Sequence, residues 1–298
     1  MSIGRALRTA GLVIVAGIVL FALFVVVQSG RALSRKYPVP AIALAVPTDS
    51  TAIARGEHLV QAVGACATCH DADLGGKVYA EMGPVGVVAG PNLTRGQGGR
   101  GAGFVDADWI RALRVGAHRD STSLLMMPSE VYTNFSDADI GAIVAYLKQL
   151  KPVDREIITS YFKPLGRTLL AVGALDILSA PKTTARITVP EVLPTEEASY
   201  GRYLVEAAGC AGCHGPGLSG GAVAGPPGLP PAANLTPAGL GKWTEADFIH
   251  AIREGKRPGG TAINPFMPWE SYRGMTDSEL RAIWHYLQSV PSRAFGGR

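Results

Sequence analysis

The sequence predicts an all-α protein in which two tandem helical domains follow one N-terminal transmembrane helix. Three observations lead to this prediction. The run from Gly11 to Val27 is apolar and carries no charge. One short cysteine-containing motif occurs twice, and the segments around its two copies repeat in the same order. Within each repeat, apolar residues recur with the 3.6-residue period of a helix.

We expect the chain to divide at the ends of these segments. The expected parts are an N-terminal membrane anchor at residues 1–36, a linker at 37–51, a first domain at 52–152, an interdomain connector at 153–194 and a second domain at 195–298.

The N-terminal run is near the minimum length for a helix that crosses a bilayer. A cleaved signal peptide would have a shorter apolar core, followed closely by a cleavage site of small residues. Here Arg31 and Arg35 follow the run, and the small-residue pattern Ala41-Ile42-Ala43 lies farther downstream. We therefore expect a retained single-pass anchor. The proline-punctuated segment Tyr37–Pro47 is expected to be extended and to hold the first domain off the membrane surface.

Cys66-Ala67-Thr68-Cys69-His70 has the C-x-x-C-H spacing of a haem c attachment site. Two thiols on one helical turn can add to the two vinyl groups of one porphyrin, and the next histidine can then bind the iron as its proximal ligand. The motif returns as Cys210-Ala211-Gly212-Cys213-His214, and the two copies use all four cysteines. Disulfides or a zinc site would need no histidine after each pair. We expect two covalently attached haem c groups.

The repeat extends well beyond the haem motif. The matching segments are Gly56–His70 with Gly201–His214, Pro91–Thr94 with Ala233–Thr236, Asp106–Gly116 with Glu245–Gly255, and Met127–Leu147 with Met267–Leu287. This pattern indicates a duplicated domain with one haem in each copy.

Each copy is expected to contain three main helices. The first carries the haem motif and covers residues 56–65 or 201–209. The second starts after Asp106 or Thr244, with acidic residues in its first turn. The third starts at Ser136 or Thr276, each followed three residues later by an acid, as in a capping box.

Two further expectations concern packing on these helices. Gly56 and Gly201 lie near the start of the first helix, while Tyr146 and Tyr286 lie on the last. We expect each glycine–tyrosine pair to form a close helix crossing. His58, His250 and His285 also fall on predicted helices and are expected to be surface or packing residues.

A methionine followed by proline stands between the second and third helices of each copy, at Met127 and Met267. A thioether is a soft ligand that favours ferrous iron, so both are candidates for the sixth iron ligand. A core methionine that fills a gap is the alternative. Met126 is a competing neighbour, but the repeat aligns Met127 with Met267. His118 is another candidate in the first copy.

Other polar positions recur in step with the repeat and are candidates for binding the haem propionates, which need donors when buried. They are Asn92, Asn234, Arg114, Arg253 and Trp243, whose counterpart is Phe104. For the arginines, a solvent-exposed helix face is the alternative. A carbonyl before Asn-Leu-Thr is expected to accept the Nδ1 proton of the proximal histidine.

With these motifs the chain resembles the class I c-type cytochromes over residues 52–292. It is most similar to the multihaem cytochrome c subunits of membrane-bound alcohol, gluconate and related dehydrogenases. Those subunits carry three haems and usually an anchor near the C-terminus, whereas this chain has two motifs and an N-terminal apolar run. The resemblance implies electron transfer from a periplasmic dehydrogenase towards quinone or a terminal oxidase.

We therefore expect a non-enzymatic relay of single electrons, with the haem domains in the periplasm and redox proteins or subunits of a membrane oxidoreductase complex as partners. The alternatives are a haem enzyme, such as a dihaem peroxidase or a thiol-oxidising cytochrome, and a gas or redox sensor. The net charge of +4 is diffuse and does not indicate nucleic-acid binding. The apolar segment Ile157–Leu178 is expected to pack in the seam between the two copies or to dock a partner.

Overall fold

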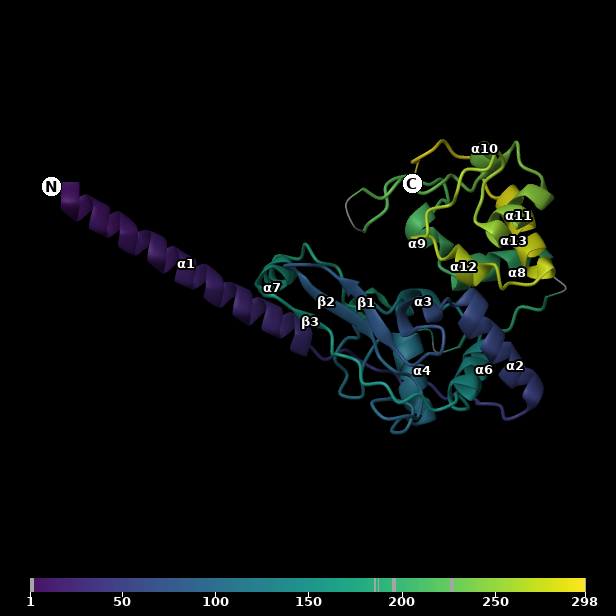
Figure 1. The fold of residues 1–298 in the computed structure, drawn as a ribbon, viewed down its shortest axis with the longest axis horizontal. Helices are drawn as coiled ribbons and strands as arrows, with labels where there is room; N and C mark the ends of the chain where they lie inside the picture. The colour runs from purple at the N-terminus through teal and green to yellow at the C-terminus, as the bar shows by residue number, and fades with distance from the viewer. Residues whose placement is uncertain (1–2, 185, 187, 195–196, 226–227, 298) are drawn as a thin grey trace.

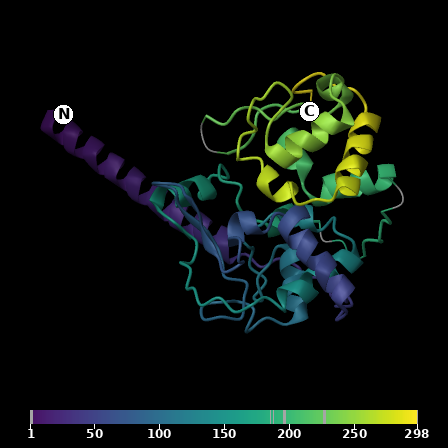
Figure 2. The same ribbon diagram turned by 45° about the vertical axis from the view of Figure 1, so that its right-hand side comes forward.

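The computed structural model describes residues 3–184, 186, 188–194, 197–225 and 228–297. One long helix, α1 (Ile3–Ser34), projects alone from a globular part that divides into two lobes (Figure 1). The first lobe holds the first copy of the repeat and the second lobe the second copy. The view turned by 45° gives the same arrangement (Figure 2).

Three main helices are present in each lobe, as predicted. The elements of the first lobe are α2 (Ser50–His58), a π-helical turn η1 (Leu59–Val63), α3 (Ala67–His70), β1 (Lys77–Glu81), β2 (Gly86–Gly90), α4 (Asp106–Val115), α5 (Ser129–Tyr132) and α6 (Asp137–Leu147). Those of the second lobe are α8 (Glu197–Ala207), α9 (Cys210–His214), α10 (Pro237–Leu240), α11 (Glu245–Glu254), α12 (Trp269–Tyr272) and α13 (Asp277–Ser289). The connector contributes β3 (Tyr161–Phe162), α7 (Pro164–Ala171) and a 3₁₀ turn, η2 (Ala180–Lys182).

Local capping explains where the main helices start. Ser136 Oγ accepts a hydrogen bond from the Asp139 N–H at the start of α6. Thr276 and Glu279 form a reciprocal capping box at the start of α13, as predicted. The first helix begins earlier than predicted, at Ser50, because the Asp49 side chain accepts from the Ala52 N–H at 2.9 Å and caps it.

Both predicted helix crossings are confirmed. A Cβ added to Gly56 would lie 2.0 Å from the carbonyl oxygen of Ala142 and 3.0 Å from Cβ of Tyr146. The same construction at Gly201 puts the added atom 2.9 Å from Cβ of Tyr286. Each glycine therefore lets the first and last helices of its copy approach backbone to backbone.

The expectation of an all-α fold is wrong in one place. β1, β2 and β3 form an antiparallel sheet in that order, and β1 and β2 form a hairpin between the first haem motif and Pro91. The hairpin follows from an alternating, valine-rich sequence around a turn at Gly83-Pro84. Among the described residues of the corresponding stretch, 221–225 and 228–232, the second copy has an isolated bridge, Gly221–Ala232, and no strand.

The segments before and after the first lobe pack differently from the prediction. Residues 37–47 are extended, but Ile42, Leu44 and Val46 pack on the core, so this segment does not hold the lobe away from the membrane. In the connector, β3 pairs with β2, and α7 packs against α1. The apolar part of the connector therefore does not fill the seam between the lobes.

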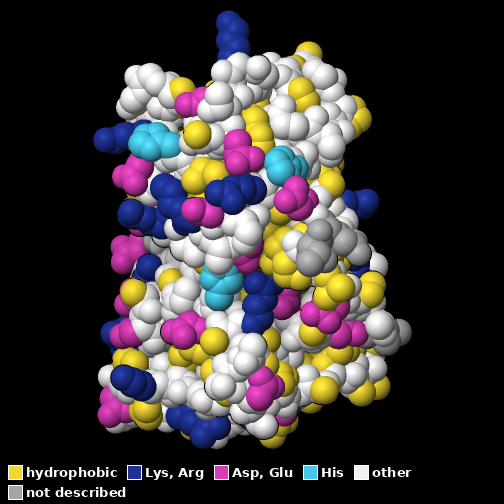
Figure 3. Space-filling model, turned by 90° about the vertical axis from the view of Figure 1, so that its right-hand side faces the viewer, with side chains coloured by type: hydrophobic (Ala, Val, Ile, Leu, Met, Phe, Trp, Pro, Cys, Tyr) yellow, Lys and Arg dark blue, Asp and Glu magenta, His cyan; other side chains and the backbone are white. Residues whose placement is uncertain are grey.

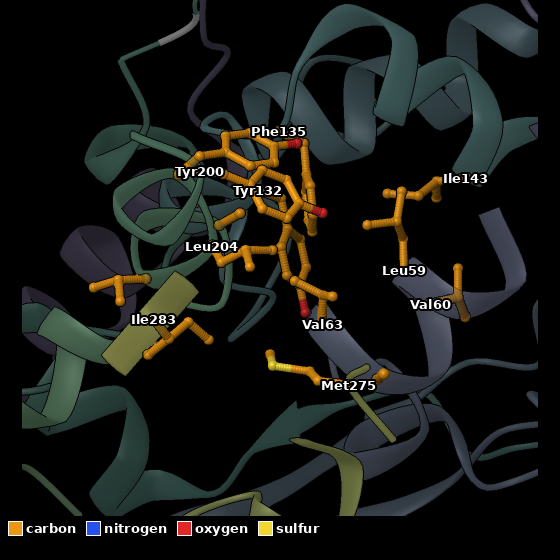
Figure 4. Close-up of a cluster of buried hydrophobic side chains, with 14 of the residues drawn as sticks. Leu59, Val60, Val63, Tyr132, Phe135, Ile143, Tyr200, Leu204, Met275 and Ile283 are labelled. Atoms are coloured by element: carbon orange, nitrogen blue, oxygen red, sulfur yellow. The ribbon is translucent and has the colours of Figure 1, made fainter. Parts of the chain in front are cut away.

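The seam is filled by side chains of both lobes, which form one continuous apolar cluster. Leu59, Val63 and Tyr132 of the first lobe meet Leu204 and Met275 of the second in this cluster (Figure 4). The two lobes therefore share a core.

A buried polar network lies beside this cluster. Arg55 of α2 donates to Asp139 of α6 and, across the seam, to Glu279 of α13. Tyr203 of α8 donates in the opposite direction, to Asp139. His58 also contacts Glu279 across the seam, so it is a packing residue, as expected. These bonds fix the orientation of one lobe on the other.

Candidate haem sites

Each C-x-x-C-H motif is folded as one short helical turn. Cys66 is the residue before α3, and Cys210 is the first residue of α9. The residue directly after each motif, Asp71 or Gly215, has a positive φ, so the chain changes direction immediately after the histidine. Both thiols and the imidazole of a copy therefore come from one turn, which is the arrangement that thioether attachment of one porphyrin requires.

The histidines of the two motifs are oriented in the same way. The Nδ1 of His70 lies 2.8 Å from the Pro91 carbonyl oxygen, and the Nδ1 of His214 lies 2.7 Å from that of Ala233. Burial lowers the pKa of both imidazoles below the ordinary value. A neutral ring that donates from Nδ1 keeps a lone pair on Nε2 for a metal. The predicted carbonyl before Asn-Leu-Thr is confirmed in both copies.

Asn92 and Asn234 hold the loops that carry these carbonyls. The Asn92 side-chain oxygen accepts from the N–H and hydroxyl of Thr94, and its amide donates to the carbonyls of Val153 and Arg155. Asn234 makes the same contacts with Thr236 and donates to Arg293. These bonds position the histidine's acceptor. Propionate binding by either asparagine stays a prediction, and Asn234 is one of the residues that line the cavity of the second lobe.

The second lobe contains a cavity of about 440 Å³ beside its motif. Its lining joins both motif cysteines and the histidine to the predicted methionine and tryptophan: Cys210, Cys213, His214, Met267 and Trp243. The rest of the lining is mainly apolar, with side chains such as Leu240, Phe248 and Ile283. The volume is within the usual range for cofactor pockets, and the donor set of thiols, imidazole and thioether fits a haem c.

The loop that carries each methionine is tied to the helix before the haem motif. Tyr132 Oη donates to the Gly64 carbonyl at 2.8 Å, and Tyr272 Oη donates to the Ala208 carbonyl at 2.8 Å. Each tyrosine lies five residues after its methionine in the repeat, and its acceptor lies two residues before the first cysteine. From the sequence these tyrosines are recognisable only as matching positions of the repeat.

The first copy has three candidates for the sixth iron ligand, and they differ in how far each side chain is buried. Met127 packs against the core, and its carbonyl accepts from Ser179 Oγ at 2.6 Å. Met126 is 40% exposed, and His118 is exposed in the loop after α4. The packing favours Met127, the residue that the repeat also selects.

The arginines at matching positions of the repeat, Arg114 and Arg253, make hydrogen bonds within the protein that the sequence did not predict. Arg114 is fully buried, and its guanidinium donates to the Thr133 and Phe135 carbonyls and to Asp137. Arg253 donates to the Arg273 carbonyl and to Asp277. Both fasten the loop ahead of the last helix. Arg114 is therefore not on a solvent-exposed face, and Arg253 does not line the cavity.

The structure shows two hydrogen-bond donors near the candidate sites that the sequence did not indicate. Arg257 lines the cavity of the second lobe, four residues beyond Arg253. Trp109 is buried, and its Nε1 has no hydrogen-bond partner among the described residues. Its counterpart in the repeat, Phe248, lines the second cavity. The indole N–H of Trp109 is thus available to an acceptor that a cofactor would bring.

The structure gives no support for a zinc site or for disulfides at the four cysteines. In the part of the chain that the structure describes, no group of three or more His, Cys, Asp or Glu side chains could hold a metal ion by itself. The four sulfurs are not joined in disulfides. Burial raises the pKa of Cys66 to about 12 and that of Cys210 to about 12.

Comparison with known proteins gives one family. The sequence profile described as Cytochrome c matches residues 53–151 and 198–291, so each match contains one of the two motifs.

Several characterised proteins are similar to the chain. The fructose dehydrogenase cytochrome subunit of Gluconobacter japonicus is 33% identical over 140 residues, which cover 43% of this chain and 28% of that protein. The alcohol dehydrogenase (quinone) cytochrome c subunit of Gluconacetobacter polyoxogenes is 28% identical over 84% of this chain and 58% of that protein. A diheme cytochrome c-type protein of Cereibacter sphaeroides is 32% identical over 33% of this chain and 37% of that protein. The chain thus matches between about a quarter and three fifths of the length of these relatives.

Proposed function

The chain belongs to the cytochrome c family, and from this premise we propose that it is a membrane-anchored dihaem cytochrome that relays single electrons. It would take them from a dehydrogenase or a quinol-oxidising complex and pass them to an acceptor such as a terminal oxidase. The observation that carries the proposal is that His214 and Met267 line one cavity of the second lobe, and that the repeat places a C-x-x-C-H motif and a Met-Pro pair at the same positions of the first lobe.

The residues that would hold the two haems follow the repeat. Cys66 and Cys69, with His70 and Met127, would hold the first. Their counterparts in the second lobe are Cys210, Cys213, His214 and Met267, which line one cavity. A haem bound in such a site supplies an iron centre that gains and loses one electron, and a thioether ligand raises its potential.

The protein holds these ligands rigidly. The hydrogen bonds to Pro91 and Ala233 fix the tautomer and the ring orientation of the histidines. The tyrosine bonds to Gly64 and Ala208 fix the methionine loops. A site with two fixed protein ligands leaves no coordination position for a substrate. This arrangement supports electron transfer rather than the peroxidase, thiol-oxidising or sensor alternatives.

The partner is proposed from the relatives. Proteins named as cytochrome subunits of fructose and alcohol dehydrogenases align with the chain, and the second alignment spans most of it. We infer that this chain serves a membrane dehydrogenase in the same way. The chain matches only part of those relatives, so the substrate of the dehydrogenase has to be identified by experiment.

The packing of α1 supports a retained anchor, and we place the lobes in the periplasm because bacteria attach haem c outside the cytoplasmic membrane. Val25 and Ser29 of α1 are buried by the folded part of the chain, and α1 is the one described helix that is long and apolar enough to cross a membrane. A signal peptide that is removed would not form part of the folded contacts. Mass spectrometry of the purified protein tests this point, because a mature N-terminus beyond Val27 would contradict it.

Stopped-flow spectroscopy of the purified protein tests the relay. The reduced protein, mixed with an oxidised soluble cytochrome c, should transfer two electrons per chain, one from each haem. It should not turn over hydrogen peroxide or thiosulfate. Steady consumption of either substrate would overturn the proposal in favour of a haem enzyme.

A further inference from the structure

The short helix α7 lies beside the last apolar turn of α1, and we propose that α7 rests in the headgroup region of the bilayer that α1 crosses. It would form a second membrane contact that fixes the orientation of both lobes on the membrane. This inference rests on the proposed anchoring of the chain through α1.

The position of α7 along α1 is the first support. Val25 is 8% exposed and Ser29 is fully buried, whereas Val26 and Val27 between them remain exposed. The guanidinium of Arg167 in α7 donates to Ser29 Oγ at 3.4 Å. The apolar run of α1 ends at Val27, and we take this residue as the edge of the hydrocarbon core for a helix of this length. α7 packs beside this end of α1 (Figure 1), so in the proposed anchoring it lies level with the membrane surface.

The second support is an apolar face of α7 that no protein group covers. Gly166 and Leu170 point inward, and a Cβ on Gly166 would lie 2.0 Å from the Val85 carbonyl oxygen. Leu165 in the first turn of α7 is 44% exposed, and Val172, the residue directly after the last turn, is 55% exposed. These two residues are seven positions apart, so they lie on the same side of the helix axis. A helix with one buried and one exposed apolar face needs a second apolar partner.

The charges around α7 favour a lipid surface as that partner. From Tyr161 to Leu175 the chain contains Lys163 and Arg167 but no acidic residue. Arg31 and Arg35 follow the apolar run of α1 at the same level. Exposed apolar residues flanked by basic ones are typical of helices that lie in the membrane interface and contact anionic headgroups. By contrast, the face turned away from α1 mixes Lys and Arg with Asp and Glu (Figure 3).

The segments that follow α1 hold the first lobe close to the end of this helix. Because residues 37–47 pack along the first lobe, no free spacer separates that lobe from the end of α1. Lys36 at the end of α1 is paired with Asp120 at 2.7 Å, and the Tyr37 N–H donates to the Ser121 carbonyl at 2.9 Å. The first lobe is thus fastened directly at the membrane edge.

The test uses spin labels on three valines of similar exposure in the full-length holoprotein in lipid nanodiscs that contain phosphatidylglycerol. The variants are Val172→Cys on α7, Val105→Cys at the start of α4 and Val19→Cys in the middle of α1, whose valines are 55%, 62% and 59% exposed. Haem attachment consumes the four native cysteines, so each label is unique. Relaxation by oxygen, which concentrates in lipid, is compared with relaxation by a water-soluble nickel chelate.

We expect the label at residue 172 to respond severalfold more to oxygen than to the nickel chelate, as the label at residue 19 does. The label at residue 105 should show the reverse. The proposal is overturned if residue 172 behaves like residue 105, or if it is shielded from both reagents by contact between copies. If the label at residue 19 is itself relaxed by nickel, the proposed anchoring fails, and this result is distinct from a failure of α7 alone.

Discussion

His58 Nε2 lies 2.7 Å from a carboxylate oxygen of Glu279, and these two residues belong to different lobes. The repeat gives this contact a counterpart. His58 aligns with Tyr203 and Glu279 aligns with Asp139, and Tyr203 donates to Asp139 across the same seam. The first and last helices of the two copies are therefore joined by two equivalent bonds in opposite directions, with Arg55 between them.

This contact predicts a loss of stability in acid. Burial by itself would raise the pKa of Glu279, but the hydrogen bond and charge of His58, together with the Thr276 N–H and Arg55, lower it to about 2 from an ordinary 4.5. A carboxyl whose pKa is lower in the folded state stabilises the fold above pH 4.5 and loses that contribution as the pH falls from 4.5 towards 2. The loss is roughly 3 kcal/mol and is measured by guanidinium denaturation across this range.

Glu279→Gln isolates this contribution. The variant should be less stable than the parent at neutral pH by about 1–3 kcal/mol, because the bonds from His58 and Arg55 lose their charged acceptor while Arg55 keeps Asp139. It should also lack most of the acid dependence. Glu254→Gln, on an exposed position of α11, is the matched control and should change neither. A parental acid profile in Glu279→Gln would show that other carboxyls carry it.

The helix crossing at Gly56 predicts a steric effect. Gly56→Ala should lower stability by about 1–3 kcal/mol or more, because the added methyl overlaps the Ala142 carbonyl and the helices must separate. Gly103→Ala is the control, since a Cβ there meets nothing within 4 Å. Thermal unfolding followed by circular dichroism compares the two. Equal melting temperatures would mean that the crossing accommodates a side chain.

Replacing Asn92 or Asn234 should lower the stability of the protein by different amounts. Asn92→Ala removes four hydrogen bonds at a fully buried site, and we expect a loss of about 2–4 kcal/mol. Asn234→Ala removes the same kind of contacts at a more exposed site and should cost less. If the role is positional, the folded fraction of each variant keeps a full haem content by pyridine haemochrome assay. Stable, haem-deficient protein would instead indicate direct binding of the cofactor.

The methionine loops predict a change in redox potential. Met267→Ala should lower the potential of one haem only and leave the other unchanged, because a thioether stabilises ferrous iron. Met127→Ala should do the same to the other haem. Met126→Leu is the control, since Met126 is exposed and should leave both potentials unaltered. A spectroelectrochemical titration resolves the two centres. A shift in the Met126 variant alone would exchange the roles of the two neighbours.

The sequence predicted what depends on short stretches of chain. The C-x-x-C-H turns, the caps at Ser136 and Thr276 and the glycine–tyrosine crossings all follow from residues close together or from the repeat. The repeat also indicated the segment before Asn-Leu-Thr as the source of the carbonyls that orient the histidines, without choosing the residue. These features need no knowledge of how distant segments meet.

What the sequence did not predict depends on distant pairings. His58 and Glu279 are 221 positions apart, and helical periodicity does not indicate which surface residues will face each other across a seam. β3 pairs with a hairpin that the second copy lacks, so the repeat gave no sign of a sheet. The arginines of the repeat were expected near the haems, yet their partners, Asp137 and Asp277, belong to the last main helix of each copy.

In the proposed relay each iron keeps two protein ligands, and a carbon monoxide difference spectrum of the reduced native protein measures whether either iron has a free position. We predict no spectral change, because the fixed histidine and methionine of each lobe leave no free position. Stoichiometric binding of carbon monoxide at either haem would contradict the claim and would point to an enzyme or a sensor.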